Sequence, residues 1–178
     1  WGKEQLIRDC RITQIYEGTN GIQALDLLGR KVLGSGGAYY HLFADEIRQF
    51  TASVGADLME FTQPLNDAVQ TLDELTAWLL DRAASNPNEI GAASVEYLHV
   101  LGYTAYAYMW ALMARTALQK QDQDVFYRTK LGTARQHDGA VPRFQVFFFA
   151  RLLPRVHSLA AAVRAGSESL FLLDADQF

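Results

Sequence analysis

The residues best suited to chemistry stand close together near the start of the chain. Glu17 offers a carboxylate, and small or polar residues follow it in the order Gly18, Thr19, Asn20, Gly21 and Gln23. A carboxylate within hydrogen-bonding reach of an acidic proton can act as a general base. Thr19 is a typical N-cap residue, so the N–H groups of a helix beginning there would suit a phosphate, an oxyanion or a polar cofactor edge. Spacing alone equally allows Glu17 merely to complement the helix dipole.

A second pattern could hold a metal. Glu96 and His99 have the Glu-x-x-His spacing of di-iron helical bundles, which places both residues on one helix face. Such a site needs a second pair, but His41, His137 and His157 have no glutamate three residues before them. We therefore expect no metal site and interpret His99 as a half-buried histidine with a hydrogen-bond partner. We expect core packing for the nearby aromatic residues Tyr97, Tyr103, Tyr106, Tyr108 and Trp110.

Helices must position these residues, because no segment alternates apolar and polar residues for long enough to predict a strand. Residues 19–33 are expected to form a short amphipathic helix, with Asp26 pairing with Arg30 and Gly34 as the stop. After a glycine-rich loop, a second helix ends near Gly55. Its apolar stripe is predicted to be Tyr39, Phe43, Ile47, Phe50 and Val54.

The rest of the chain predicts longer helices. A heptad seam runs through residues 58–79, where Pro64 requires either a restart or a kink of the helix. After a break at residues 85–88, the segment 89–119 is apolar on almost every side and is expected to be the central helix. A further helix is predicted at 123–136, with the turn signal Asp138-Gly139 after it. Another is predicted along an apolar stripe from 148 to 163, with a kink at Pro154 and an end at Gly166. We expect residues 167–178 to be strand-like or irregular and to lie against the bundle.

The predicted fold class is therefore all-α, an up-and-down helical bundle from about residue 39 to 165 with a different segment before it. The chain has 178 residues, of which 49% are hydrophobic and 20% charged, and this excludes a disordered protein. Its formal net charge of −4 and scattered basic residues argue against a nucleic-acid partner. No stretch predicts a membrane span or a secretory signal. The single cysteine, Cys10, fits the cytoplasm, with burial as a small apolar residue its expected role.

Residues 1–32 carry a more specific motif, with Ile-Tyr-Glu-Gly-Thr-Asn-Gly-Ile-Gln at positions 15–23 and Asp-Leu-Leu-Gly-Arg-Lys at 26–31. This run resembles the end of the catalytic region of acyl-CoA dehydrogenases. The continuation, including Leu153-Pro154 and Ala165-Gly166, is similar to the extra helical C-terminal domain of the longer bacterial members. We therefore expect residues 1–34 to end a catalytic helical domain, and residues 35–178 to form the C-terminal-like bundle.

The resemblance implies that Glu17 is the catalytic base of an FAD-dependent α,β-dehydrogenation of acyl-CoA thioesters. It also implies that Gly18 contacts substrate, and that FAD is contacted by Thr19, Asn20, Gly21 and Gln23. The domains that hold most of the flavin and CoA are not found in these residues. We therefore expect a C-terminal fragment of a homo-oligomeric enzyme that uses an electron acceptor, inactive by itself. The alternative is a non-catalytic helical bundle that serves subunit assembly or interaction.

Overall fold

The computed structural model describes residues 4–16, 18–120 and 146–173, and these contain no β-strand. Its α-helices are α1 (Glu4–Cys10), α2 (Asn20–Leu25), α3 (Ala38–Ser53), α4 (Met59–Ser85), α5 (Asn88–Lys120) and α8 (Arg155–Arg164). Shorter helical turns are η1 (Arg11–Gln14), η2 (Asp26–Val32), η3 (Leu33–Ser35), η4 (Ala56–Leu58), η5 (Phe148–Leu152) and η6 (Glu168–Phe171). The helix expected at residues 123–136 lies outside the described residues.

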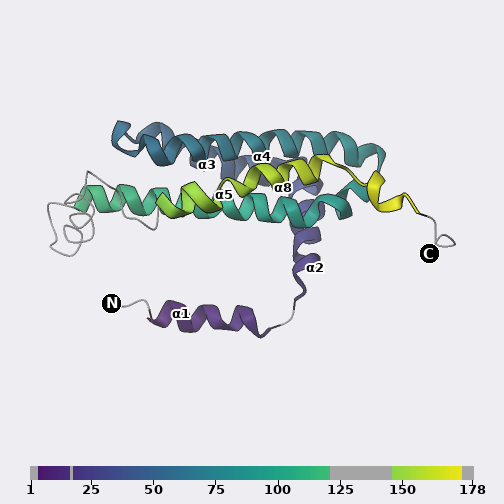
Figure 1. Cartoon of the computed structure of the whole chain (residues 1–178), viewed down its shortest axis with the longest axis horizontal. Helices are drawn as coiled ribbons and strands as arrows, with labels where there is room; N and C mark the ends of the chain where they lie inside the picture. Colours follow the sequence, from purple (N-terminus) through teal and green to yellow (C-terminus); the bar gives the residue numbers. More distant parts are fainter. Residues whose placement is uncertain (1–3, 17, 121–145, 174–178) are drawn as a thin grey trace.

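Four helices, α3, α4, α5 and α8, lie side by side and alternate in direction along the long axis of the molecule (Figure 1). The central helix is α5, which packs against α4, α8 and the segment α2–η2. This arrangement confirms the all-α, up-and-down bundle and the central place of residues 89–119. Within the described part of the chain, no helix combines the length and the apolar character that a membrane crossing requires.

Helix α4 confirms the heptad seam, because every predicted member is at most 4% exposed: Leu58, Phe61, Leu65, Ala68, Leu72, Leu75 and Leu79. The helix begins at Met59 and runs through Pro64 without a restart. Pro64 lies near the N-terminal end, where removal of one backbone donor interrupts few helical hydrogen bonds.

Helix α3 differs from its predicted stripe at the start. Tyr39 was expected in the core but is 64% exposed, whereas its neighbour Tyr40 is 2% exposed. The Tyr40 hydroxyl donates to Asp73 Oδ1 at 2.8 Å and lies 3.1 Å from the Val69 carbonyl oxygen. These contacts with α4 give the buried phenol its polar partners, so the helix turns Tyr40 inward.

The helical segment that begins at Asn20 also runs further than predicted. It continues through η2 and η3 to Ser35, so Gly34 is not the stop. The chain reverses at Gly36 and Gly37, with φ of 62° and 85°. Gly36 N donates to Leu33 O at 2.9 Å and Gly37 N to Val32 O at 2.8 Å, which is the Schellman pattern. The stop falls at Gly36 because this residue adopts the left-handed conformation.

At Pro154, where a kink was predicted, the structure has a full interruption of the helix. A π-type turn at η5 precedes this proline, and α8 begins after it, at Arg155. The end of α8 by Gly166 is confirmed, with φ of 72° there. The described part of the tail is irregular, one of the two expected forms, because Glu168–Phe171 form a 3₁₀ turn and no strand. The side chains of Leu170 to Leu173 are all more than half exposed, so they do not lie against the bundle.

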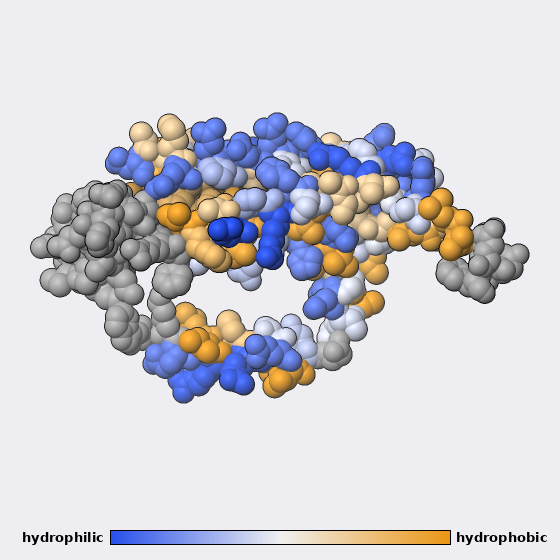
Figure 2. Space-filling model, viewed as in Figure 1, coloured by the Kyte–Doolittle hydropathy of each residue, from blue (hydrophilic) through white to orange (hydrophobic). Residues whose placement is uncertain are grey.

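The N-terminal segment stands apart from the bundle, connected to it through α2 (Figure 1). All of its described residues, 4–16, are exposed. Figure 2 shows hydrophobic residues on the surface of this arm. Cys10 is exposed, so the expectation that it is buried was wrong. The physical reason is that no helix among the described residues covers α1.

Candidate functional site

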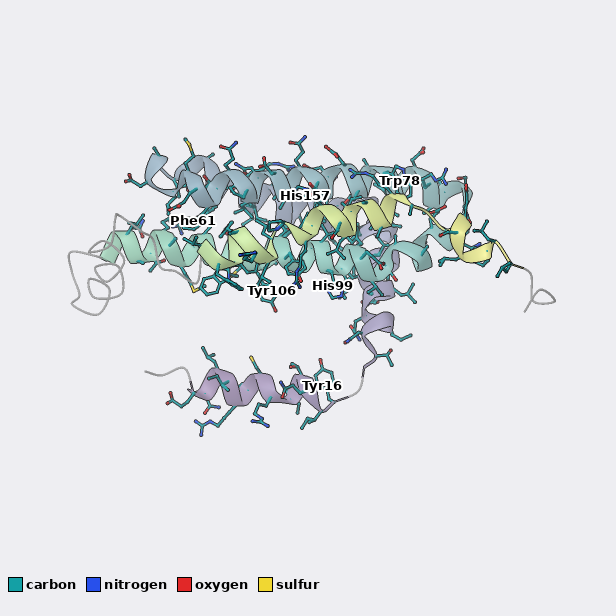
Figure 3. The ribbon with its side chains drawn as sticks, viewed as in Figure 1. Tyr16, Phe61, Trp78, His99, Tyr106 and His157 are labelled. Carbon is teal, nitrogen blue, oxygen red and sulfur yellow. The ribbon has the colours of Figure 1, made fainter. Side chains whose placement is uncertain are left out.

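The predicted site lies where the N-terminal arm joins α2. Glu17, the predicted base, lies outside the described residues, while its neighbours Tyr16 and Gly18 are described. Tyr16 is 61% exposed and Gly18 is half-buried. Figure 3 shows Tyr16 at the end of the arm, away from the bundle. Tyr16 therefore lies in an open part of the molecule, and Gly18 is partly covered.

Thr19 stands at the N-cap position of α2, as expected, but with an unusual backbone. Its φ is 38° and its ψ is 120°, whereas a capping residue is typically extended. Among the described non-glycine residues, Thr19 alone has a positive φ. A β-branched residue rarely adopts this conformation, so a sharp bend separates residue 18 from the helix. The Thr19 carbonyl still accepts the N–H of Gln23 at 3.2 Å, which begins the helical pattern.

Gln23 folds back toward the bend. A Cβ built on Gly18 would lie 3.6 Å from Gln23 Nε2 and 3.7 Å from Tyr16 Cε2, both ordinary contacts. A Cβ built on Gly21 would meet nothing within 4 Å. The chain itself therefore does not demand glycine at either position, and open space remains beside the backbone at Gly21.

The residues after the bend are held by the bundle. Ala24 and Leu28 are fully buried, and α2 and η2 both pack against α5. At Gly29 the backbone approaches α5 so closely that a Cβ would lie 3.2 Å from Ile90 Cγ2. The first turn of α2 is thus exposed, whereas the residues that follow it are buried against α5.

The predicted ion pair below the site is confirmed. Asp26 pairs with Arg30 and also with Lys31, at 3.4 Å. The hydrogen bond from Arg30 lowers the pKa of the Asp26 carboxyl below its usual value. These charges lie on the segment that anchors α2, so they support its packing and are separate from the bend.

The residues at the start of α2 present exposed polar groups. Asn20, Gly21 and Gln23 are all exposed, and the first N–H groups of a helix have no partner within it. Amide groups and free N–H groups are suitable donors to a polar ring edge or a phosphate. The other surface near this end is an open hollow on the arm, lined by Leu6, Ile7, Cys10, Arg11 and Gln14.

The alternative metal pattern finds little support in the geometry. Glu96 is half-buried, but His99 is exposed, which corrects the expectation of a half-buried histidine. The described residues contain no group of three or more His, Cys, Asp or Glu side chains placed to hold a metal ion.

The aromatic residues of α5 divide between core and surface. Tyr97 and Tyr108 are at most 5% exposed and bond to Thr76 Oγ1 at 2.7 Å and Glu46 Oε1 at 3.0 Å, which confirms their packing role. Tyr106 is 63% exposed, so core packing was the wrong expectation for this residue.

One buried carboxylate, that of Glu89, was not identified by any sequence pattern. Glu89, near the start of α5, is fully buried and lies among Arg82, Asn86 and Ser167. These residues come from three parts of the chain, and no local spacing identifies them. The nearest local signals are Asn86, three residues before Glu89, and Arg82, seven residues before it across the turn between α4 and α5.

The chain is similar to dehydrogenases that act on acyl-CoA. It is 37% identical to 3-methylmercaptopropionyl-CoA dehydrogenase of Ruegeria pomeroyi over 139 residues, which are 75% of this chain and 24% of that protein. It is 26% identical to butyryl-CoA dehydrogenase of Syntrophomonas wolfei over 183 residues, which are 98% of this chain and 28% of that protein. The chain thus spans about a quarter of the length of these relatives.

A family profile covers most of the chain. Residues 43–174 match the family described as acetyl-CoA dehydrogenase C-terminal like. The matched range takes in most of the bundle, and its all-α fold agrees with the match. The chain therefore belongs to the acetyl-CoA dehydrogenase C-terminal-like family.

Proposed function

We propose that this chain is the C-terminal part of an FAD-dependent acyl-CoA dehydrogenase that introduces a double bond between the α and β carbons of an acyl-CoA thioester. The observation that carries the proposal is the family match, together with relatives whose names are those of acyl-CoA dehydrogenases. The exposed first turn of α2, whose following residues pack against α5, is compatible with it, since further protein or a ligand can cover this turn.

Glu17 is the proposed base. Its carboxylate removes the α-proton of the thioester, and the hydride that leaves the β carbon is accepted by FAD when this group is bound. A carboxylate serves here because the proton must be taken by a group held within hydrogen-bonding reach. Burial against the acyl chain in the complete enzyme would raise the pKa of such a carboxylate toward the working pH. The backbone N–H of Glu17 is proposed to polarise the thioester carbonyl.

The residues after Glu17 are proposed to bind. Gly18 contacts the substrate, and FAD is contacted by Thr19, Asn20, Gly21 and Gln23. The free space beside Gly21 and the exposed amides of Asn20 and Gln23 are compatible with these roles. Residues 1–34 end the catalytic helical domain in this proposal, and residues 35–178 form the additional bundle. An electron acceptor, a cytoplasmic location and assembly into a homo-oligomer complete it.

One substitution tests the base. In the whole polypeptide that carries this chain, Glu17→Gln should lower kcat by at least about 10⁴-fold, since a general base contributes about 10² to 10⁴ and an essential proton acceptor more. FAD content, measured by visible absorbance, should stay unchanged. The control is Glu60→Gln on the exposed start of α4, which should leave kcat unchanged. Unaltered turnover in Glu17→Gln would show that the base lies elsewhere.

The 178-residue chain alone should not oxidise an acyl-CoA when an artificial electron acceptor is added. Turnover by this chain would refute the proposal that it is an inactive part. The Glu17→Gln variant of the whole polypeptide also tests the alternative of a purely structural bundle, because that alternative predicts an unchanged kcat for it.

A further inference from the structure

Gly29, in the helical segment that carries the proposed site, lies unusually close to helix α5. A Cβ built on Gly29 would lie 3.2 Å from Ile90 Cγ2, which is closer than the roughly 3.5–4.0 Å at which carbon atoms pack. A Cβ built on Gly91, the residue after Ile90, would meet nothing within 4 Å. Glycine is unfavourable inside a helix, so its place at position 29 calls for a reason. The close approach to α5 is such a reason.

The side chain of Ile90 has little freedom to move away from a larger residue at position 29. Its Cγ2 is bonded directly to the branched Cβ, so this methyl group moves only by rotation about χ1, which is stiff for isoleucine in a helix. The backbone there is also fixed, because the neighbouring Glu89 is fully buried and accepts two hydrogen bonds from Ser167. A larger residue at position 29 must therefore displace its own segment and leave α5 in place.

The segment α2–η2 carries such a displacement to the proposed site. It is helical without a break from Asn20 through Val32, so its residues move together. Gly29 lies about 14 Å from Asn20 along a helix of this rise per residue. Figure 1 shows α2 running across the direction of α5, with its first turn away from the bundle. A shift at Gly29 thus reaches the turn that follows Glu17 in the chain.

The buried residues of α2–η2 fix which face the segment turns toward α5. Ala24, Leu28 and Val32 recur every four residues and are at most 1% exposed. Four residues exceed the about 3.6 of one α-turn, so in a regular α-helix this row would drift around the axis. The wider π-type turn η2 counters that drift and keeps the row on the side that packs against α5. Gly29 is held near α5 by this packing.

We propose that Gly29 and Ile90 are a positioning pair, whose close contact sets where the first turn of α2 and the adjoining Glu17 lie in the active site. The inference rests on the proposed dehydrogenase function. Through this pair, the additional bundle places groups that the catalytic domain uses. Since misplacement of a reacting group by about 1 Å can cost about 10²-fold in rate, a shift of about 0.5 Å costs about tenfold.

Substitutions in the whole polypeptide, with FAD in excess, test the pair. Gly29→Ala should lower kcat about tenfold. The KM for acyl-CoA should change by less than about twofold, because the displaced group acts in the chemical step. Adding Ile90→Ala removes the methyl group that Ala at position 29 would meet, so the double variant should recover at least about half of the unaltered kcat. Gly91→Ala adds the same methyl group to an exposed position one residue further along and should leave kcat unchanged.

Amide hydrogen exchange, followed by mass spectrometry without FAD, gives a readout that does not need flavin chemistry. Peptides within residues 19–28 should exchange at least about threefold faster in Gly29→Ala, since η2 then packs less closely on α5, and should slow again in the double variant. An unchanged kcat in Gly29→Ala, or no recovery with Ile90→Ala, would overturn the positioning pair. An unaltered polypeptide that does not oxidise acyl-CoA would instead contradict the proposed function, and the exchange rates would still decide whether the contact fixes the segment.

Discussion

The carboxylate of Glu89 accepts the backbone N–H of Ser167 at 3.1 Å, across 78 residues of sequence. The Ser167 hydroxyl donates to the other carboxylate oxygen, also at 3.1 Å. Asn86 Nδ2 lies 3.3 Å from Glu89 Oε1, and Arg82 Nη2 lies 3.4 Å from the same oxygen. Since Glu89 is fully buried, this cluster fastens the end of α8 to the turn between α4 and α5.

Glu89→Ala should therefore lower the free energy of unfolding by about 2–4 kcal/mol. The substitution leaves the buried Ser167 N–H without its acceptor and removes one of the two carboxylates with which Arg82 pairs. Ser167→Ala, which keeps the backbone donor, should lower it by only about 1 kcal/mol. Urea unfolding followed by circular dichroism measures both values. A loss below about 0.5 kcal/mol for Glu89→Ala, the range of an ordinary surface substitution, would contradict this role of the carboxylate.

Gly166→Ala should destabilise the chain by more than about 1 kcal/mol. Its φ of 72° is strained for any other residue, and a Cβ would lie 3.4 Å from Glu89 Oε2. The control is Gly91→Ala in α5, where a Cβ meets nothing within 4 Å and the helix should gain about 0.5–1 kcal/mol. The midpoints of urea unfolding should thus move in opposite directions, and an unchanged or raised midpoint for Gly166→Ala would show that this position does not need glycine.

The chain should lose stability as the pH rises from 10 to 12. Burial raises the pKa of Tyr97 from about 10 to about 12, so the folded chain keeps this phenol neutral after the unfolded chain has released its proton. The stabilisation is complete below pH 10 and is lost as the pH rises through this window, by at most about 1.4 kcal/mol per pH unit for one phenol. Burial and the bond to Asp73 also raise the pKa of Tyr40.

Tyr97→Phe tests this slope. The variant loses the bond to Thr76 at every pH, but between pH 10 and 12 its free energy of unfolding should fall less steeply than that of the unaltered chain. Tyr39→Phe, at an exposed position, should keep the steeper fall. If urea unfolding gives the same slope for all three proteins, the burial of Tyr97 does not govern the alkaline loss.

Trypsin should cut the separate chain after Arg8 and Arg11 at least about tenfold faster than after Arg48. The arm is exposed throughout, and helices shorter than about 12 residues are marginal in water without packing. Arg48 lies in α3 and pairs with Asp73 of α4. Mass spectrometry of timed digests gives the rates. Comparable rates at Arg11 and Arg48 would mean that the arm packs firmly in solution.

Local periodicity was enough to predict most helices. The α4 seam repeats every three or four residues, so its buried face follows from the sequence, and Asp26 and Arg30 pair because they lie one turn apart. The break at Pro154 and the end at Gly166 follow from the backbone limits of those two residues. The candidate site was predicted only as a string of residues, through its resemblance to a family.

Contacts between segments that are distant in sequence decided which other side chains are buried. Tyr40 and not Tyr39 enters the core because Val69 and Asp73 lie where its hydroxyl can reach them, and no spacing within α3 contains that information. Glu89 is buried because α8 ends beside it. Cys10 and Tyr106 are apolar enough for a core but remain in solvent, because burial needs a second surface that the described chain does not provide. The sequence by itself determined which segments are helical and which face of α4 is apolar, since both depend on neighbouring residues. Only the tertiary structure decided which surfaces are covered, since that depends on what lies opposite.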